Sequence, residues 1–123
     1  QKEIKIYGND WPTLDGTCVR DYIHVMDLAE GHMRTLKLLF SEKNIFINLN
    51  LGTGRGKTVL EVIKTFEKTN SVEIPFVFEN RREGDNGIVV ADVSLSKKVL
   101  NWSASLTLED MCRDSWAWEM NRN

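Results

Sequence analysis

Short apolar runs with alternating polar positions predict strands in several parts of the chain. A period of two is typical of a strand with one buried face, and turn-forming residues bound each run. The predicted strands cover residues 4–7, 45–49, 74–79 and 88–91, and residues 19–25 continue an extended pattern. Clusters of Gly, Asn, Asp and Pro predict loops over residues 8–17 and 81–87.

A helical period of apolar residues predicts the first helix. Asp27 stands where it would cap a helix that starts at Leu28, because its carboxylate can accept from the free N–H groups of the first turn. Apolar residues at spacings of three and four would then share one face of this helix. They are Ala29, Met33, Leu36, Leu39 and Phe40.

Capping residues predict three further helices. Thr58 and Glu61 have the spacing of a capping box, in which each side chain bonds to a backbone N–H of the first turn. A second, short helix that ends near Leu100 would be capped by Asp92 or Ser94. Thr107 and Asp110 would begin the third. Strands and helices alternate along the chain, so the sequence predicts a mixed α/β fold with α+β character.

Length, composition and charge narrow the class of protein. The chain has 123 residues, of which 41% are hydrophobic and 28% are charged, so one domain over residues 1–123 is expected. The net charge of -2 disfavours a domain that binds nucleic acid through its phosphates. No apolar run approaches the roughly 20 residues of a membrane span, so a membrane is not an expected partner.

The few cysteines and histidines give little indication of a metal site. Cys18 and Cys112 are far apart and neither belongs to a Cys-x-x-Cys pair, so a zinc site is not expected. Unpaired thiols are typical of a reducing compartment, and the cytoplasm is the expected location. The first residue is Gln and no signal-peptide pattern follows it, so we expect the chain to begin inside a longer gene product.

A glycine-rich segment at residues 52–58 is similar to a nucleotide phosphate loop, because a predicted strand precedes it and a predicted helix follows it. Three residues separate Gly52 from the Gly-Lys-Thr at 56–58, whereas a phosphate loop has four. The dinucleotide-binding pattern also fails, since Lys57 stands in place of its third Gly. A structural turn before a helix is favoured, and an ATPase loop is the minor alternative.

Two arginines in separate predicted loops are candidates for anion binding. Arg20 precedes Asp21, and Arg82 lies three residues before Asp85. Two guanidinium groups can hold a diphosphate through paired hydrogen bonds. The alternative is that each arginine forms a surface ion pair with its neighbouring aspartate, which would contribute little.

Four segments resemble the C-terminal, substrate-binding part of the UDP-glucose 4-epimerases, a family of extended short-chain dehydrogenases/reductases. They are residues 6–29, with Asp-Gly-Thr at 15–17 and Arg-Asp-Tyr at 20–22, and residues 50–54, 81–85 and 108–116. Related nucleotide-sugar dehydratases usually lack the Asp-Gly-Thr. The resemblance implies a small domain beside an N-terminal Rossmann domain, which is absent here together with its NAD site and its catalytic Tyr-x-x-x-Lys motif.

The resemblance also implies the residues that contact substrate. Arg20 and Arg82 should bind the diphosphate of a UDP-hexose, and Asp85 should accept from the ribose hydroxyls or orient Arg82. The residues expected along the uridine are Lys5, Ile6 and Tyr7, those expected to line the same pocket are Tyr22 and Val59, and Val89 should face the sugar. Because Val89 is small, tolerance of N-acetylated sugars is expected.

The family reaction that the resemblance implies is a transient NAD-dependent oxidation at C4, which interconverts UDP-glucose and UDP-galactose. The 123 residues alone are then expected to be inactive, and the complete protein is expected to form a homodimer. Two alternatives stay open. One is another nucleotide-sugar enzyme of the same superfamily, such as a dehydratase or decarboxylase, and the other is a stand-alone UDP-sugar-binding module.

Overall fold

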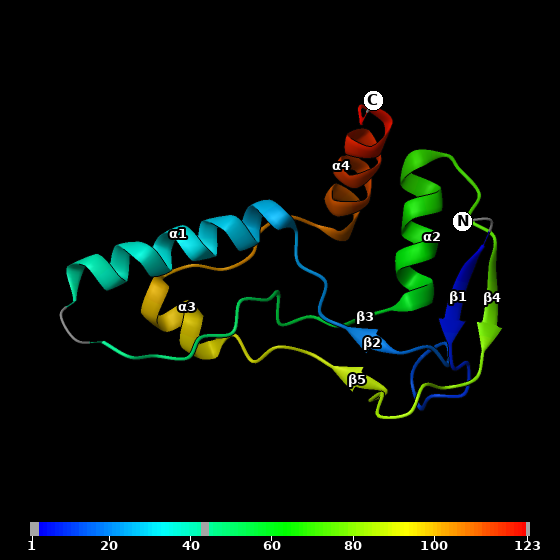
Figure 1. Ribbon diagram of the computed structural model, residues 1–123, viewed down its shortest axis with the longest axis horizontal. Helices are drawn as coiled ribbons and strands as arrows, with labels where there is room; N and C mark the ends of the chain where they lie inside the picture. Colours follow the sequence, from blue (N-terminus) through cyan, green and yellow to red (C-terminus); the bar gives the residue numbers. More distant parts are fainter. Residues whose placement is uncertain (1–2, 43–44, 123) are drawn as a thin grey trace.

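The structure, a computed structural model, describes residues 3–42 and 45–122. Figure 1 shows an elongated molecule, in which a body of strands and two helices continues into an arm formed by the other two helices. The elements in chain order are β1 (Ile4–Tyr7), β2 (Val19–Arg20), α1 (Val25–Ser41), β3 (Lys57–Thr58), α2 (Val59–Asn70), β4 (Phe76–Glu79), β5 (Ile88–Val89), α3 (Ser94–Leu100) and α4 (Leu108–Met120). This order confirms the predicted mixed α/β class.

The strands form two small sheets. In the first sheet, β1 and β4 run parallel, with Ile4 opposite Phe76 and Tyr7 opposite Glu79. In the second, β2 lies between β3, which is antiparallel to it, and β5, which is parallel to it. Each strand of the second sheet has only two residues, so the backbone ladder alone fixes little of its geometry.

Helices α2 and α4 pack against each other beside the sheets (Figure 1). The rings of Phe66 and Trp116 meet edge to face, with centroids 5.8 Å apart and an angle of 86° between the planes. Asn70 Nδ2 donates to the backbone oxygen of Cys112 at 3.2 Å, and Cys112 is buried. Aromatic packing and a side-chain hydrogen bond therefore hold the two helices together.

Two of the predicted helix starts are confirmed in detail. Thr58 caps α2 and Thr107 caps α4, and both form the reciprocal hydrogen bonds of a capping box, with Glu61 and Asp110. The short helix α3 ends at Leu100 as predicted, but neither expected residue is its cap. Its cap is Val93, while Asp92 accepts from the N–H and the hydroxyl of Ser94.

The predicted start of α1 is wrong by three residues. The helix begins at Val25, and its cap is His24, whose Nδ1 accepts from the N–H of Met26 at 3.0 Å. Asp27 is buried and serves another purpose, because its carboxylate accepts from the N–H groups of Ser105 and Leu106 at 3.0 and 2.8 Å. Asp27 thereby ties α1 to the segment before α4. The extended stretch expected over residues 19–25 is correspondingly shorter, since only β2 is paired.

The predicted strand at residues 45–49 is not formed. These residues have no regular structure, and the side chain of Phe46 is 91% exposed. A strand requires a neighbouring backbone to satisfy its N–H and C=O groups. None of the other described segments pairs with residues 45–49.

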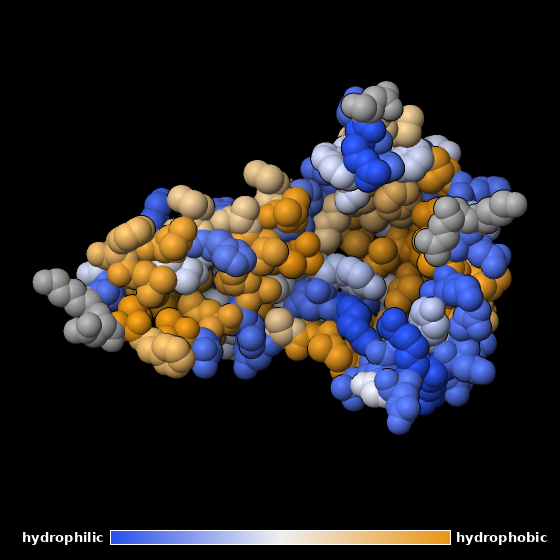
Figure 2. Space-filling view, in the orientation of Figure 1, coloured by the Kyte–Doolittle hydropathy of each residue, from blue (hydrophilic) through white to orange (hydrophobic). Residues whose placement is uncertain are grey.

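The apolar face expected on α1 exists, but it is exposed. Met33, Leu36, Leu39 and Phe40 are all accessible, and Phe40 is 89% exposed. Figure 2 shows apolar residues over much of the arm that α1 and α3 form. Exposed apolar surface of this extent is typical of a face that another structure covers.

The cap of α4 gives an expected response to acid. Hydrogen bonds from the backbone and hydroxyl of Thr107 and from Arg113 hold the pKa of Asp110 well below its usual range. The stabilisation is therefore fully present above the unfolded-state pKa near 4 and is lost as the pH falls through the folded-state pKa. We expect Asp110→Asn to reduce the acid dependence of the free energy of unfolding below pH 4, as measured by urea denaturation at several pH values.

The matched control for Asp110→Asn is Glu109→Gln, in the same helical turn. The carboxylate of Glu109 accepts none of the hydrogen bonds found among the described residues. Its replacement should therefore leave the acid dependence of the free energy of unfolding unchanged. If Asp110→Asn left the decrease in the free energy of unfolding below pH 4 unchanged, the role given to this cap would be contradicted.

Candidate functional site

The carboxyl ends of β1 and β4 bring an aromatic ring and an arginine together. Tyr7 ends β1 and lies opposite Glu79, which ends β4, and Arg82 follows three residues later. The guanidinium carbon of Arg82 lies 4.4 Å from the centre of the Tyr7 ring, at the distance of a cation–π contact. The parallel pairing therefore places two predicted site residues side by side.

Arg20 reaches the same place from β2. Its Nη2 lies 3.9 Å from Asp85 Oδ1, and Arg82 Nε donates to Asp85 Oδ2 at 3.1 Å. The two guanidinium groups thus approach the two oxygens of one carboxylate. The Arg82–Asp85 contact is the ion pair that the sequence analysis named as the alternative, whereas a pairing of Arg20 with Asp21 is not found among the described residues. We name Tyr7, Arg20, Arg82 and Asp85 the arginine cluster.

The second sheet adds a row of side chains beside the arginine cluster. Lys57 and Val89 are the register partners of Arg20 on either side, and directly opposite residues share a face of a sheet. Val89 therefore stands on the same face of this sheet as Arg20. Lys57 adds a third positive charge beside Arg20 and Arg82, which the sequence analysis did not assign to this site, and its Nζ lies 3.2 Å from Glu61 Oε1. The neighbouring Val59 begins α2 and donates its N–H to the oxygen of Cys18 at 3.1 Å.

Lys5 and Ile6 lie in the middle of β1, directly before Tyr7 of the arginine cluster. Lys5 Nζ is 2.8 Å from Glu79 Oε1, and this hydrogen bond raises the pKa of Lys5. Ile6 is 2% exposed, so its side chain belongs to the core and only its backbone can face a ligand. The first sheet has two strands, so β1 keeps one unpaired edge within the described part of the chain.

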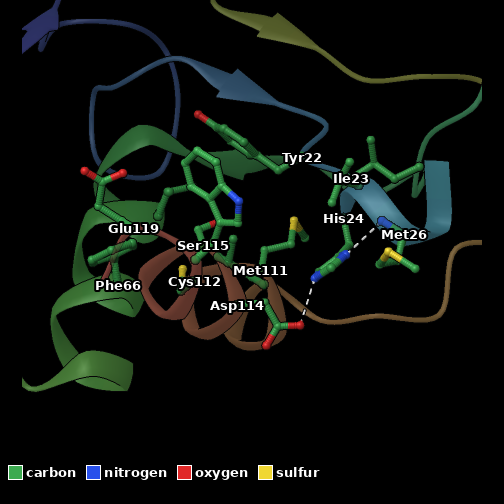
Figure 3. A pocket seen from close by; sticks show the side chains of 14 residues that line it. Tyr22, Ile23, His24, Met26, Phe66, Met111, Cys112, Asp114, Ser115 and Glu119 are labelled. Carbon is green, nitrogen blue, oxygen red and sulfur yellow. Dashed lines mark hydrogen bonds and ion pairs between the residues drawn. The ribbon is translucent and has the colours of Figure 1, made fainter. Parts of the chain in front are cut away.

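Tyr22 lies two positions after Arg20 in the chain and lines a cavity of about 920 Å³. The cavity lies between the start of α1, α2 and α4, and its lining is mostly apolar (Figure 3). Burial raises the pKa of the Tyr22 hydroxyl, and the nearby charge of Arg20 opposes that rise. Among the labelled residues, Figure 3 shows Met111, Cys112 and Phe66 on the helices around Tyr22. Trp118 is also part of the lining and is 64% exposed.

His24 joins the two helices that border this cavity. Its Nδ1 caps α1, and its Nε2 lies 3.2 Å from Asp114 Oδ2 on α4, as the dashed lines in Figure 3 show. Because Nδ1 accepts a hydrogen bond, the proton of the neutral ring is on Nε2, which then donates to Asp114. His24 is therefore a structural histidine that links α1 to α4.

The glycine-rich segment is not a phosphate loop. The strand that should precede it is missing, and the N–H groups of Thr53 and Gly54 each donate to the carboxylate of Asp21 at 2.9 Å. Amides that are bonded to a carboxylate are unavailable to a phosphate. The same contacts, together with Lys57 in place of a glycine, mean that this segment does not fit the pyrophosphate of NAD. The structural turn is confirmed, and the ATPase alternative fails.

The loop that carries Arg82 and Asp85 is held by contacts that the sequence analysis missed. Arg81 Nε donates to Asp10 Oδ1 at 2.7 Å, and its guanidinium carbon lies 3.8 Å from the centre of the Trp11 ring. Gly87 packs closely on the same ring, since a Cβ there would lie 2.8 Å from Trp11 Cε3. The only sequence signal for this anchor was the aromatic residue inside a polar loop.

The described residues show neither a metal-binding cluster nor a membrane-spanning helix. Residues 3–42 and 45–122 contain no cluster of three His, Cys, Asp or Glu side chains arranged to hold a metal ion. None of the helices in this part of the chain has the length and apolar character of a membrane span.

Comparison with known proteins identifies the family. A family model described as GDP-mannose 4,6 dehydratase matches residues 1–115. The chain belongs to this dehydratase family. Among curated relatives of this family member, UDP-glucose 4-epimerase GEPI42 of Cyamopsis tetragonoloba is 50% identical over 120 residues, which are 97% of this chain and 34% of the relative.

Solved structures give the same result. A UDP-glucose 4-epimerase from Stenotrophomonas maltophila, with bound NAD and formylated UDP-arabinopyranose, matches with a TM-score of 0.92 and 48% identity over 98% of this chain and 35% of that one. The Bifidobacterium longum enzyme in complex with NAD+ and UDP also has a TM-score of 0.92, with 45% identity over 99% of this chain and 36% of that one. The chain thus spans about a third of the length of these epimerases. The high TM-scores confirm the predicted mixed α/β fold.

Proposed function

We propose that the arginine cluster binds the diphosphate of a UDP-hexose. The observation that carries this proposal is that Arg20 and Arg82, from separate segments, approach the two oxygens of Asp85. A carboxylate is a planar anion with two acceptor oxygens, so groups that converge on it are also placed to converge on phosphate oxygens. The 61% exposed side chain of Arg82 is accessible to such a ligand.

The neighbouring residues are assigned to the rest of the substrate. Tyr7 and the backbone at Lys5 and Ile6 would lie along the uridine, because the free edge of β1 offers N–H and C=O groups to a base. Asp85 would accept from the ribose hydroxyls or orient Arg82. Tyr22 and Val59 would line the same pocket, and Val89 would face the sugar.

At the level of the complete protein, we propose a UDP-glucose 4-epimerase that interconverts UDP-glucose and UDP-galactose. The role of these 123 residues would be to hold the nucleotide while the hexose reacts, so that binding energy far from C4 orients the reacting carbon. The binding of NAD and the chemistry at C4 are assigned to the part of the relatives that this chain does not match. Homodimer formation and a cytoplasmic location are proposed with it.

An N-terminal Rossmann domain is the partner that we propose for the exposed apolar surfaces. Phe40 on α1, Phe46 in the unpaired segment and Trp118 at the cavity would all be covered by it. This partner also supplies a reason why the isolated chain should be inactive.

The alternatives are distinguished by what they predict for catalysis. A dehydratase or decarboxylase of the same family is consistent with the family model. However, the relatives that share about half of their matched residues with this chain are named epimerases. A stand-alone UDP-binding module would use the same arginine cluster without any partner domain.

A chimeric enzyme tests the proposal. This chain would replace the matching third of the Bifidobacterium longum epimerase, and conversion of UDP-galactose to UDP-glucose would be measured. We expect conversion by the chimera and none by the isolated chain. A chimera that folds and binds NAD but converts no UDP-hexose would contradict the epimerase proposal. Comparison of N-acetylated and plain substrates before and after Val89→Tyr tests the expected tolerance.

A further inference from the structure

The carboxylate of Asp21 receives four hydrogen bonds from two distant segments. Its Oδ1 accepts from the N–H of Thr53 at 2.9 Å and from the hydroxyl of the same residue. Its Oδ2 accepts from the N–H of Gly54 at 2.9 Å and from the N–H of Ala91 at 3.3 Å. Both oxygens are therefore fully engaged with the protein itself.

Close packing around Asp21 confirms that these segments are held in one arrangement. Gly52 is buried, and a Cβ at this position would lie 2.7 Å from both Asp21 Oδ2 and the Cβ of Ala91. The following turn passes through Gly54 with φ +70, where a glycine is favoured. The turn, Asp21 and Ala91 thus fit together without space for another methyl group.

Asp21 lies between two of the proposed ligand residues in the chain, and it accepts a hydrogen bond from a residue close to a third. Arg20 and Tyr22 flank it in sequence, and Ala91 follows Val89 by two residues. The pairing of Arg20 with Val89 belongs to strands of only two residues, whose ladder has few hydrogen bonds. The bond from Ala91 to Asp21 adds a further connection between these strands.

The charge of Asp21 is also directed away from the arginine cluster. Its two oxygens are bonded to backbone and hydroxyl donors, whereas the guanidinium of Arg20 lies near Asp85. Asp21 therefore does not compete with a bound anion for Arg20.

We infer that Asp21 is a positioning residue, which fixes Arg20 and Val89 relative to each other so that the arginine cluster is preformed. This inference rests on the proposed function, because it assumes that Arg20 contacts the ligand. Asp21 itself would contact no substrate atom.

Asp21→Asn is the variant that tests this role. Asparagine keeps the shape, but it places an NH₂ group against backbone N–H donors and leaves one oxygen to accept. We expect the dissociation constant for UDP, measured by NMR titration without magnesium, to rise by about tenfold, since small displacements of binding groups are costly. The matched control is Asp92→Asn, the same change at a carboxylate whose hydrogen bonds, within the described residues, all come from Ser94.

A double-mutant cycle separates positioning from general stability. If Asp21 acts through Arg20, Asp21→Asn should weaken UDP binding much less in an Arg20→Ala background than in the unchanged chain. Equal effects in both backgrounds would overturn the inference and leave the arginine cluster intact as a binding site. Thr53→Val, which removes one donor to Asp21, should show the same non-additivity with a smaller rise, and it decides the question if Asp21→Asn does not fold.

The two proposals fail in different ways. Normal UDP binding by Asp21→Asn, combined with weak binding by Arg20→Ala, would overturn the positioning role alone. Absence of UDP binding by the unchanged chain, or unchanged binding by Arg20→Ala, would contradict the proposed function and this inference with it.

Discussion

Replacement of either arginine of the arginine cluster should largely abolish UDP binding. Arg20→Ala and Arg82→Ala each remove a group that would form charged hydrogen bonds to the diphosphate, and such bonds are worth roughly 1.5–3 kcal/mol. The expected rise in the dissociation constant is therefore on the order of 10- to 100-fold for each variant. Isothermal titration calorimetry with UDP measures it.

The matched control for these variants is Arg34→Ala. Arg34 lies on α1, where it pairs with Glu30 at 2.8 Å, so its removal makes the same change in net charge far from the arginine cluster. We also expect Arg20→Lys to bind UDP with intermediate affinity, because lysine keeps the charge but not the paired donors. Similar affinities for Arg20→Ala and Arg34→Ala would show that the diphosphate binds elsewhere.

Gly16→Ala should cause the largest loss of stability among single substitutions in the loops. Gly16 has φ +81, and a Cβ there would lie 2.2 Å from the backbone oxygen of Asn9. A left-handed conformation costs about 1–2 kcal/mol for a residue with a side chain, and the clash with backbone adds to this cost. We expect a loss of about 3 kcal/mol in the free energy of unfolding, measured by urea denaturation.

Gly84→Ala isolates the contribution of the clash. Gly84 has the same φ of +81, but no atom lies within 4 Å of a Cβ built there. Only the conformational cost then applies, and a loss of about 1 kcal/mol is expected. If both variants lost the same free energy, the contact with Asn9 would have no energetic role.

The local parts of the fold were predictable from the sequence because their causes are local. The capping boxes at Thr58 and Thr107 depend on residues three positions apart, and both are present. The polar loops were likewise evident from their turn residues. The start of α1 was mistaken because a buried Asp27 resembles a cap in sequence, whereas its partners Ser105 and Leu106 lie about 80 residues away.

Longer-range features could not be read from the sequence. The pattern at residues 45–49 is that of a strand, but a strand also needs a partner, and sequence alternation says nothing about one. Within the site, the pairing of Arg82 with Asp85 was one stated alternative. The meeting of Arg20 with the same carboxylate, and the bonds of Asp21 to Thr53 and Ala91, depend on how separate segments approach each other.

Asp85 also affects the electrostatics of the arginine cluster. Two guanidinium groups held close together repel each other, and the carboxylate between Arg20 and Arg82 acts as an internal counter-ion that offsets the repulsion. An arriving diphosphate therefore meets arginines whose charge Asp85 already partly offsets, and fewer salt ions need to leave. Binding should consequently depend less on ionic strength than it would at a pair of isolated arginines.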